Sequence, residues 1–254
     1  YSLNPSILKC LSGEGTKKDA KDAFLFLHKR AKSGLAQTQF EYGHALFTGF
    51  DNYTFKDRKK AVDWLQLAAQ QSHVQATFYL AQAYHRGEGI EQDFVMAVHL
   101  YSELVKLEDP EVECRLGECI ANGSGYGSWS ALFPMNEAET EAEQKYFKEI
   151  MLIKGVEGTP DYWIERAASA NHIEAQYLLG GGCEWLAKSW SQRIPAYRGL
   201  MWMEMAAANG HLEAQVLVGD TYLTGEGRLA GPGFVIDTSK GFKFLKAAAE
   251  QGHF

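Results

Sequence analysis

Small and apolar residues recur along this chain in one pattern that is written several times. The segments LEAQVLVGDTYLTGEG (212–227), VQATFYLAQAYHRGEG (74–89) and PEVECRLGECIANGSG (110–125) follow it closely, and 36–49 and 173–185 follow it more loosely. Small or apolar residues fall at positions i, i+4, i+5 and i+8, which form one stripe of an α-helix. A pattern that returns at a fixed period predicts a stack of similar helical units.

Each copy has a small or apolar anchor residue near the start of its helix, which we term helix A. The anchors are Ser2, Thr38, Ala76, Val112, Ala175 and Ala214, at spacings of 36, 38, 36, 63 and 39 residues. Glycine stands five residues after four of these anchors: Gly43, Gly117, Gly180 and Gly219. Because a helical glycine costs about 1 kcal/mol relative to alanine, its recurrence predicts close approach by the backbone of a neighbouring helix.

A second helix, helix B, is predicted after each helix A. Its large residue is Phe26, Trp64, Leu100, Trp163, Trp202 or Phe244. In several copies two alanines follow this residue, four and five positions later, as in 60–72 and 199–210. The sequences Gly-Glu-Gly at 87–89 and 225–227 end the preceding helix A, since glycine just past a helix end is a C-cap signal. We predict that Trp64, Trp163 and Trp202 lie in the core, where they fill the space left by small residues of adjacent helices.

The combination of A-x3-LG-x2-Y-x2-G-x-G in helix A with KA-x2-W-L-x2-AA-x2-G in helix B resembles the Sel-one-like repeat (SLR) family, relatives of the tetratricopeptide repeats. The resemblance implies an all-α fold, a right-handed α–α superhelix of about six helix-pair repeats. It also implies a non-enzymatic scaffold that binds a protein or peptide. Thr38 departs from the pattern, and the copy that starts at Ala175 lacks the Gly-x-Gly stop.

We expect one domain over residues 1–254, with an insertion at 126–158 that accounts for the spacing of 63. The insertion begins with a loop rich in glycine and serine that contains Trp129 and Phe133, and continues in a predicted helix with an apolar stripe. It can serve a partner, as long loops often do, or fold back on its own solenoid. The sequence leaves both open.

The net charge is −7 and the pI about 5.6, which argues against a nucleic-acid partner. No apolar run of 18 residues is present, so no transmembrane segment is predicted. The four cysteines do not form a disulfide framework, because Cys114 and Cys119 are five residues apart on one helix. Unpaired thiols favour a reducing compartment. The ends at Tyr1 and Phe254 suggest a fragment of a longer chain, with more chain or self-association at the C-terminal end.

Histidines recur at the turn before helix A: His73, His172, His211 and His253. They are too far apart along the stack for one zinc ion, so we interpret them as polar turn residues. The sequence has no nucleophile–base pattern, and we expect no catalytic residue, cofactor or metal. Two alternatives remain: a bacterial-type SLR protein with ligand-binding or hydrolase-like activity, and a structural spacer that associates with itself.

In tetratricopeptide-like repeats helix A lines the concave face, and we predict a partner-binding groove there. The offsets that point away from the core stripe, together with two insertion residues, give Phe40, His44, Phe47, Phe78, Gln82, His85, Arg86, Glu118, Asn122, Tyr177, Glu184, Trp185, Asp220, Trp129 and Phe133. Basic and imidazole groups fall in the first half and acids in the second, a gradient that would orient a partner. The alternative for Phe40 and Phe78 is that they cover the seam between repeats.

Overall fold

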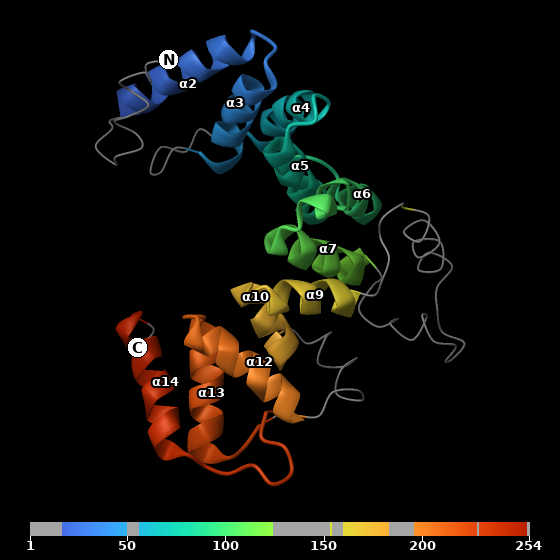
Figure 1. Ribbon diagram of the computed structural model, residues 1–254. Coiled ribbons are helices and arrows are strands. Elements are labelled where there is room, and N and C mark those ends of the chain that lie inside the picture. Colours follow the sequence, from blue (N-terminus) through green and yellow to red (C-terminus); the bar gives the residue numbers. More distant parts are fainter. Residues whose placement is uncertain are drawn as a thin grey trace. The chain divides into compact units, whose positions relative to one another are not determined.

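A computed structural model describes residues 17–49, 56–123, 153, 160–182, 196–227 and 229–252 (Figure 1). Within these ranges every regular element is a helix, so the all-α prediction is confirmed. The predicted site residues Trp129, Phe133, Glu184 and Trp185 lie outside the described residues, as does nearly all of the expected insertion. The described helices divide into two compact units, one ending at Leu107 and the other beginning at Glu108.

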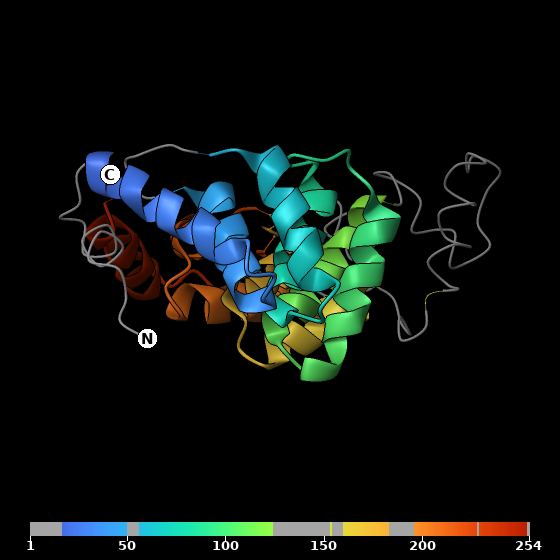
Figure 2. The same ribbon diagram turned by 90° about the horizontal axis from the view of Figure 1, so that it is seen from above.

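Unit 1 contains α2 to α6. Their bounds are α2 Lys17–Ala31, α3 Ala36–Thr48, α4 Arg58–Ala69, α5 Val74–Arg86 and α6 Phe94–Leu104, with the short 3-10 helix η1 at Val105–Leu107. Helix α3 packs on α4, and α5 packs on both α4 and α6 (Figures 1 and 2). The pairs α3/α4 and α5/α6 are therefore successive A/B repeats, and α2 is the helix B that precedes them.

Unit 2 contains three further pairs. The bounds are α7 Pro110–Gly123, α9 Pro160–Ser169, α10 Ile173–Tyr177 continued by the π-helical turn η3 Leu178–Gly182, α12 Ala196–Ala208, α13 Leu212–Thr224 and α14 Thr238–Glu250. Helix α7 packs on α9, α10 and η3 on α12, and α13 on α14. The long anchor spacing thus contains one complete helix pair, α7/α9, whose two helices are far apart in the sequence.

Caps begin and end these helices. Three of the B helices start at an aspartate whose Oδ1 accepts the backbone N–H three residues later: Asp57 for α4, Asp93 for α6 and Asp237 for α14. An oxygen at this position satisfies one of the free N–H groups of a helix start. At the other end, Gly87 and Gly225 adopt left-handed conformations with φ of 68° and 69°, which confirms them as C-caps of α5 and α13.

The recurrent glycines lie where helix A meets helix B of the same repeat. A Cβ atom on Gly117 would lie 2.6 Å from Ile164 Cγ1, and one on Gly180 would lie 2.9 Å from the backbone N of Met203. One on Gly219 would lie 2.7 Å from Leu245 Cγ. The prediction of close backbone approach is therefore confirmed.

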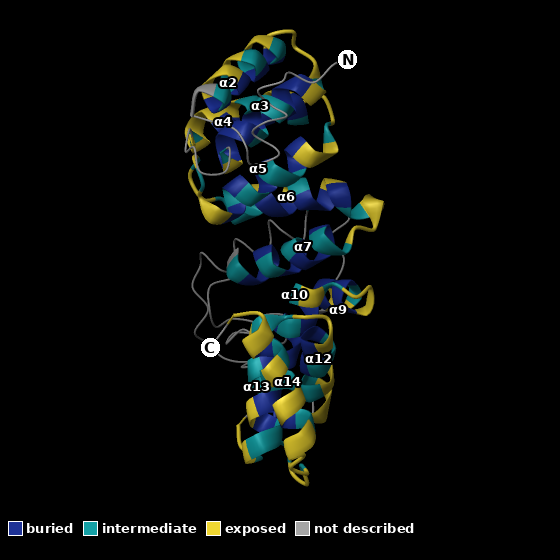
Figure 3. Ribbon diagram, turned by 90° about the vertical axis from the view of Figure 1, so that its left-hand side faces the viewer, coloured by how far each residue is buried: buried dark blue, intermediate teal, exposed yellow. Residues whose placement is uncertain are grey.

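The tryptophans of the B helices lie in or against the core, and Trp202 shares a cluster with Ala167, Ala168 and Ala175. Trp163 and Trp202 are 3% and 7% exposed, as predicted for core residues. Figure 3 shows buried positions along the helices of each unit. Trp64 is half-buried, packs against the unit 1 core and makes an edge contact with Tyr42, with 5.4 Å between ring centroids. The large-against-small packing predicted for the repeats is thus present in both units.

The variant Gly219→Ala tests the close approach of α13 and α14. Its Cβ would overlap Leu245 and would lie 3.1 Å from the carbonyl oxygen of Gly241. Overpacking of this kind costs about 1–3 kcal/mol, which exceeds the gain in helix propensity of about 1 kcal/mol. We expect a net loss of stability in urea unfolding.

Gly199→Ala is the matched control in the same unit. A Cβ there would lie 3.7 Å from the carbonyl oxygen of Gly180, an ordinary contact, so this variant should be neutral or stabilising by up to about 1 kcal/mol. Equal stability of the two variants would contradict the packing described.

Candidate functional site

A histidine forms the N-cap of three of the A helices. His73 precedes α5, His172 precedes α10 and His211 precedes α13, each with extended backbone. In each, Nδ1 accepts the backbone N–H three residues later, at 3.2, 3.1 and 3.3 Å. A ring nitrogen that accepts carries no hydrogen, so in the neutral ring Nε2 is the donor.

The Nε2 atom of each cap reaches back to helix A of the preceding repeat. His73 donates to Gln37 Oε1 at 3.0 Å, His172 to Glu111 Oε2 at 2.6 Å, and His211 approaches Glu174 Oε2 at 3.4 Å. The three acceptors occupy the same position in their helices, two residues after the N-cap. One imidazole thus starts a helix and joins it to its neighbour.

Two predicted partner-binding aromatics stack on these histidines. Phe40 lies parallel to His73, with ring centroids 4.7 Å apart, and Tyr177 lies parallel to His211, with centroids 4.1 Å apart. Phe40 is only 8% exposed, and Phe47 and His85 are 7% and 8% exposed. The prediction that these three side chains face solvent is therefore wrong. For Phe40 the seam between repeats is the location that the structure supports.

A buried polar side chain directly follows the anchor residue in every described helix A. The residues are Gln39, Thr77, Glu113, Gln176 and Gln215. Three of them accept from an amide that follows helix B of the same repeat: Gln39 from Gln71 at 2.7 Å, Gln176 from Asn209 at 3.0 Å and Gln215 from Gln251 at 2.9 Å. These bonds close three of the repeats, and they were not predicted from the sequence although the glutamines recur at one offset.

The rest of the helix A surface in unit 1 is polar and partly aromatic. His44 Nε2 lies 3.0 Å from Tyr79 Oη, a contact that joins α3 to α5. Burial lowers the pKa of His44 below its usual value, which favours the neutral imidazole. Phe78 and Gln82 are half-buried, and Arg86 is exposed at the end of α5.

The helix A surface in unit 2 is acidic. Arg115 on α7 donates to Glu111 at 2.8 Å and to Glu118 at 2.7 Å. The pKa of Glu111 is lowered to about 2, chiefly by the hydrogen bond from His172, with Arg115 adding to the effect. Burial raises the pKa of Glu118 despite Arg115. Asp220 on α13 is exposed.

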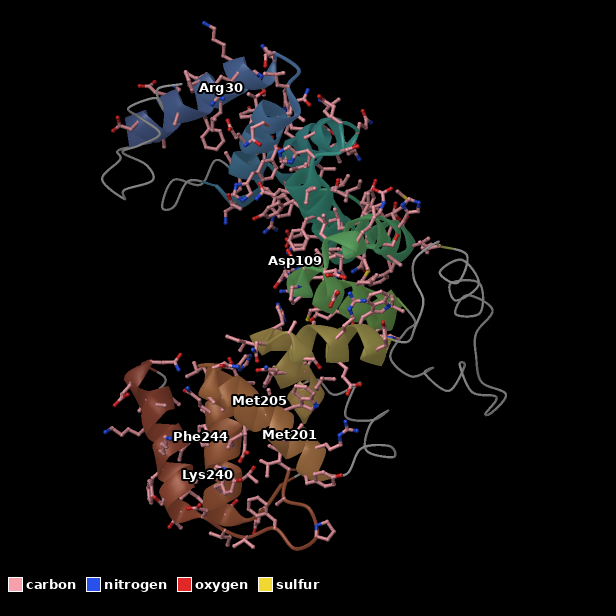
Figure 4. The ribbon with its side chains drawn as sticks, in the orientation of Figure 1. Arg30, Asp109, Met201, Met205, Lys240 and Phe244 are labelled. Carbon is pink, nitrogen blue, oxygen red and sulfur yellow. The ribbon has the colours of Figure 1, made fainter. Side chains whose placement is uncertain are left out.

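The described cysteines and the Lys240–Tyr222 pair have potentially reactive side chains, but their surroundings suit a structural role. Cys114 and Cys119 are buried, and burial raises the pKa of Cys114, which disfavours the reactive thiolate. Lys240 donates to Glu204 at 2.5 Å and to Tyr222 at 2.8 Å (Lys240 is labelled in Figure 4). Burial raises the pKa of Tyr222, and Glu204 adds to this. A protonated lysine and phenol are poor nucleophiles, so this cluster serves to join α12, α13 and α14.

The described part of the chain contains neither a bilayer-spanning helix nor a cluster of metal-ligand side chains. None of its helices combines the length and the apolar character that crossing a bilayer requires. No group of three or more histidine, cysteine, aspartate or glutamate side chains is placed there to hold a metal ion.

A family profile described as Sel1 repeat matches this chain five times, over residues 10–35, 36–73, 74–109, 173–211 and 212–253. These matches cover well over half of the chain. The pair α7/α9 lies between the third and fourth matches and is structurally a further repeat.

Solved structures of Sel1 repeat proteins resemble this one. A Sel1 repeat protein from Oxalobacter formigenes has 27% sequence identity and a TM-score of 0.61, over 97% of this chain and 60% of that chain. A protective antigen of uropathogenic Escherichia coli strains with an SLR fold has 21% identity and a TM-score of 0.46, over 96% of this chain and 52% of that chain. This chain thus spans less than two thirds of either. Among curated proteins, none matches it.

The variant His211→Ala tests the capping link. It removes the N-cap of α13, the contact with Glu174 and the stacking on Tyr177, and loss of a cap alone costs about 1–2 kcal/mol. The variant His211→Asn keeps a capping oxygen but is too short to reach Glu174, so it should recover part of the loss in urea unfolding. The matched control is His99→Ala, since His99 is exposed in the middle of α6 and lies 3.6 Å from Glu103 of the same helix. If His211→Ala costs no more than this control, the capping role is wrong.

Glu111 should make stability depend on pH. Its pKa is about 2 in the folded chain and 4.5 as an ordinary glutamate, so its ionised form is favoured by folding. That contribution is present above about pH 5 and is lost as the pH falls through 4.5 toward 2. The free energy of unfolding of the chain should therefore exceed that of Glu111→Gln at pH 7 by more than at pH 3. Glu165→Gln, on the exposed surface of α9, controls for the change of side chain, and a gap that stays constant between pH 7 and pH 3 would contradict the Glu111 contacts.

Proposed function

We propose that this chain, which belongs to the Sel1 repeat family, holds an extended segment of a partner protein against the exposed surfaces of its A helices. Sel1 repeat proteins are generally protein-interaction scaffolds. The proposal rests on the observation that the side chains of these helices fall into two sets. One set of side chains joins the repeats, and a second set at neighbouring positions stays available.

In unit 1 the available set comprises Phe78, Gln82 and Arg86 of α5, with His44 and Tyr79 beside them. His44 and Tyr79 are held together across two repeats, so the surface that they form is rigid before a partner arrives. Rigid aromatic and arginine side chains are the residue types that dominate binding energy at protein interfaces. An arginine at the edge of such a surface favours a carboxylate on the partner.

In unit 2 the available set is acidic and comprises Glu118 and Asp220, with Asn122 and Tyr177 half-buried nearby in the repeats. A carboxylate with a single arginine partner, such as Glu118, can accept further hydrogen bonds. We infer that unit 2 meets a basic or amide-rich part of the partner. Such charge complementarity speeds association and fixes orientation more than it raises affinity.

The buried side chains Phe40, Phe47 and His85 are left out of this surface, because they support the repeats rather than face a partner. Glu184, Trp185, Trp129 and Phe133 remain part of the proposal on the sequence argument alone. The proposed contact is therefore more polar than the aromatic groove expected from the sequence.

The test begins with capture of partners from the source cell and mass spectrometry, followed by affinity measurement with the purified partner. Arg86→Glu and Asp220→Lys reverse exposed charges on A helices of the two units. Each should weaken binding more than tenfold, which corresponds to about 1.4 kcal/mol, and the association rate should fall as salt is raised.

The matched control is Lys59→Glu, which reverses an exposed charge on a B helix, α4. It should bind as the unchanged chain does, and circular dichroism should show equal helix content in all three variants. Normal binding by both A-helix variants together with loss of binding in Lys59→Glu would move the partner site to the B helices.

A further inference from the structure

One hydrogen-bonded pair on the A helices of unit 1, His44 of α3 and Tyr79 of α5, can form more hydrogen bonds than it does. Nε2 of His44 lies 3.0 Å from Oη of Tyr79. Among the residues that the structure describes, neither side chain has a second hydrogen-bond partner. Both are half-buried, and Nδ1 of His44 is not one of the polar atoms sealed from solvent without a partner. A ligand can therefore reach the unused bonding positions of this pair.

The hydrogens of the pair fix what it offers to a ligand. Burial lowers the pKa of His44, so at pH 7 its ring is neutral, with one donor and one acceptor nitrogen. If Tyr79 donates to Nε2, the Nδ1–H group remains as a donor and the phenol oxygen as an acceptor. If Nε2 donates to Tyr79, Nδ1 remains as an acceptor and the phenol O–H as a donor. In both arrangements the pair presents one donor and one acceptor side by side.

Buried aromatic rings hold this pair in place. The centroid of the Phe40 ring lies 5.4 Å from that of His44 and 6.0 Å from that of Tyr79. The Phe47 ring lies 5.9 Å from Tyr79, again between centroids. Phe40 and Phe47 are largely buried, so neither offers an open face on which a ligand can stack. A ligand at this place meets the polar edges of His44 and Tyr79.

The amide of Gln82 continues this polar surface along α5. Gln82 is half-buried three residues after Tyr79, and the described residues give its side chain no hydrogen-bond partner. Residues three apart on a helix are neighbours, with Cβ atoms about 5–6 Å apart. Main-chain groups on one edge of an extended segment recur every two residues, which is about 6.6 Å. The pair and Gln82 therefore have a spacing close to that of successive main-chain amides.

The charged side chains near the pair have partners of their own. Glu41, one turn before His44 on α3, lies 3.0 Å from Arg30. Arg58, whose guanidinium lies near the Phe47 ring, is 3.6 Å from Glu88. Because these charges are matched, the surface favours an uncharged ligand group over a carboxylate or a phosphate.

We propose that His44, Tyr79 and Gln82 form a subsite for the main-chain amides of an extended peptide, and that Arg86 binds an acidic side chain of the same peptide. The inference rests on the proposed function, since it names the part of the partner that lies on unit 1. A peptide unit fits because it has one N–H and one C=O, which match one acceptor and one donor. Arg86 is exposed one turn beyond Gln82. The subsite should therefore accept many side chains, and the acidic residue should fix the register.

A library of random peptides displayed on phage is the probe, selected against the purified chain. The selected peptides should share an acidic residue and little else. The tightest one is then synthesised with each amide replaced in turn by an ester, which removes one N–H donor and weakens the carbonyl acceptor. Replacements on the N-terminal or C-terminal side of the acidic residue, two residues apart, should weaken binding at least tenfold, and the remaining replacements should have little effect.

Two variants of the chain connect these amides to the subsite. Tyr79→Phe and Gln82→Met keep the size of the side chain and remove its hydrogen-bonding group. Each should weaken the selected peptide at least tenfold, and each should make one of the costly ester replacements nearly harmless. The matched control is Tyr84→Phe, since the Tyr84 ring packs against the core cluster on the same helix. This control should bind as the unchanged chain does, and circular dichroism should show equal helix content in all three variants.

The outcomes separate the subsite from the proposed function. Normal binding by both Tyr79→Phe and Gln82→Met would overturn the subsite, and the proposed function would stand if Arg86→Glu still weakens binding. Ester replacements without effect, in a peptide whose acidic residue is lost from the Tyr79→Phe chain, would show that the pair binds a carboxylate and would overturn the main-chain assignment. A library that yields no peptide dependent on Arg86 or Asp220 would contradict the proposed function and the subsite together.

Discussion

The histidine at the start of an A helix is the contact on which the arrangement of repeats most depends. A helix start has free N–H groups that need an acceptor, and a stack of repeats needs its members held in one register. A single imidazole meets both needs, because its two nitrogens point to opposite sides. The aspartates that cap the B helices use their side chains within their own helix, and their backbone N–H groups donate to carbonyls of helix A of the same repeat. The A helix that opens unit 2 also has an aspartate, Asp109, which accepts from Glu111 N at 2.9 Å (Figure 4).

These inter-repeat contacts occupy much of the first turns of the A helices. At the N-terminal ends of α3 and α10, one position contacts the next histidine, another closes the repeat through an amide, and an aromatic stacks on the imidazole. The later turns carry the residues with freedom to contact something else, such as Gln82, Arg86 and Asp220. Under the proposed function, substitutions in the later turns can change the partner surface without disturbing the contacts between repeats.

Much of the fold follows from the sequence alone because its determinants are local. The pattern that places a B helix at 60–72 and 199–210 agrees with α4 and α12 to within three residues at each end. The glycines, the C-caps and the core positions of Trp163 and Trp202 follow from residue size and helical spacing. The pair α7/α9 was also expected, since its A helix has the motif.

The candidate surface was harder to predict, for a physical reason. Helical spacing says which side of a helix a residue is on, but not what comes from the next repeat to cover it. Phe40 is on the outward side of α3 and is buried because His73 lies against it. The histidines were recognised as recurring turn residues, but their second hydrogen bond spans about one repeat in the sequence, and no local pattern reports it. Glu111 is similar: its low pKa depends on a histidine 61 residues away.

Nuclear magnetic resonance of the ring nitrogens tests the central claim most directly. With the chain labelled with ¹⁵N in histidine, two-bond correlation spectra at pH 7.5 report which nitrogen of each ring carries the hydrogen. The account predicts that His73, His172 and His211 each carry it on Nε2, with Nδ1 unprotonated, and that the Nε2 hydrogen of His172 exchanges slowly with water. Hydrogen on Nδ1 in these three rings, or an averaged signal like that of the exposed His99, would contradict it.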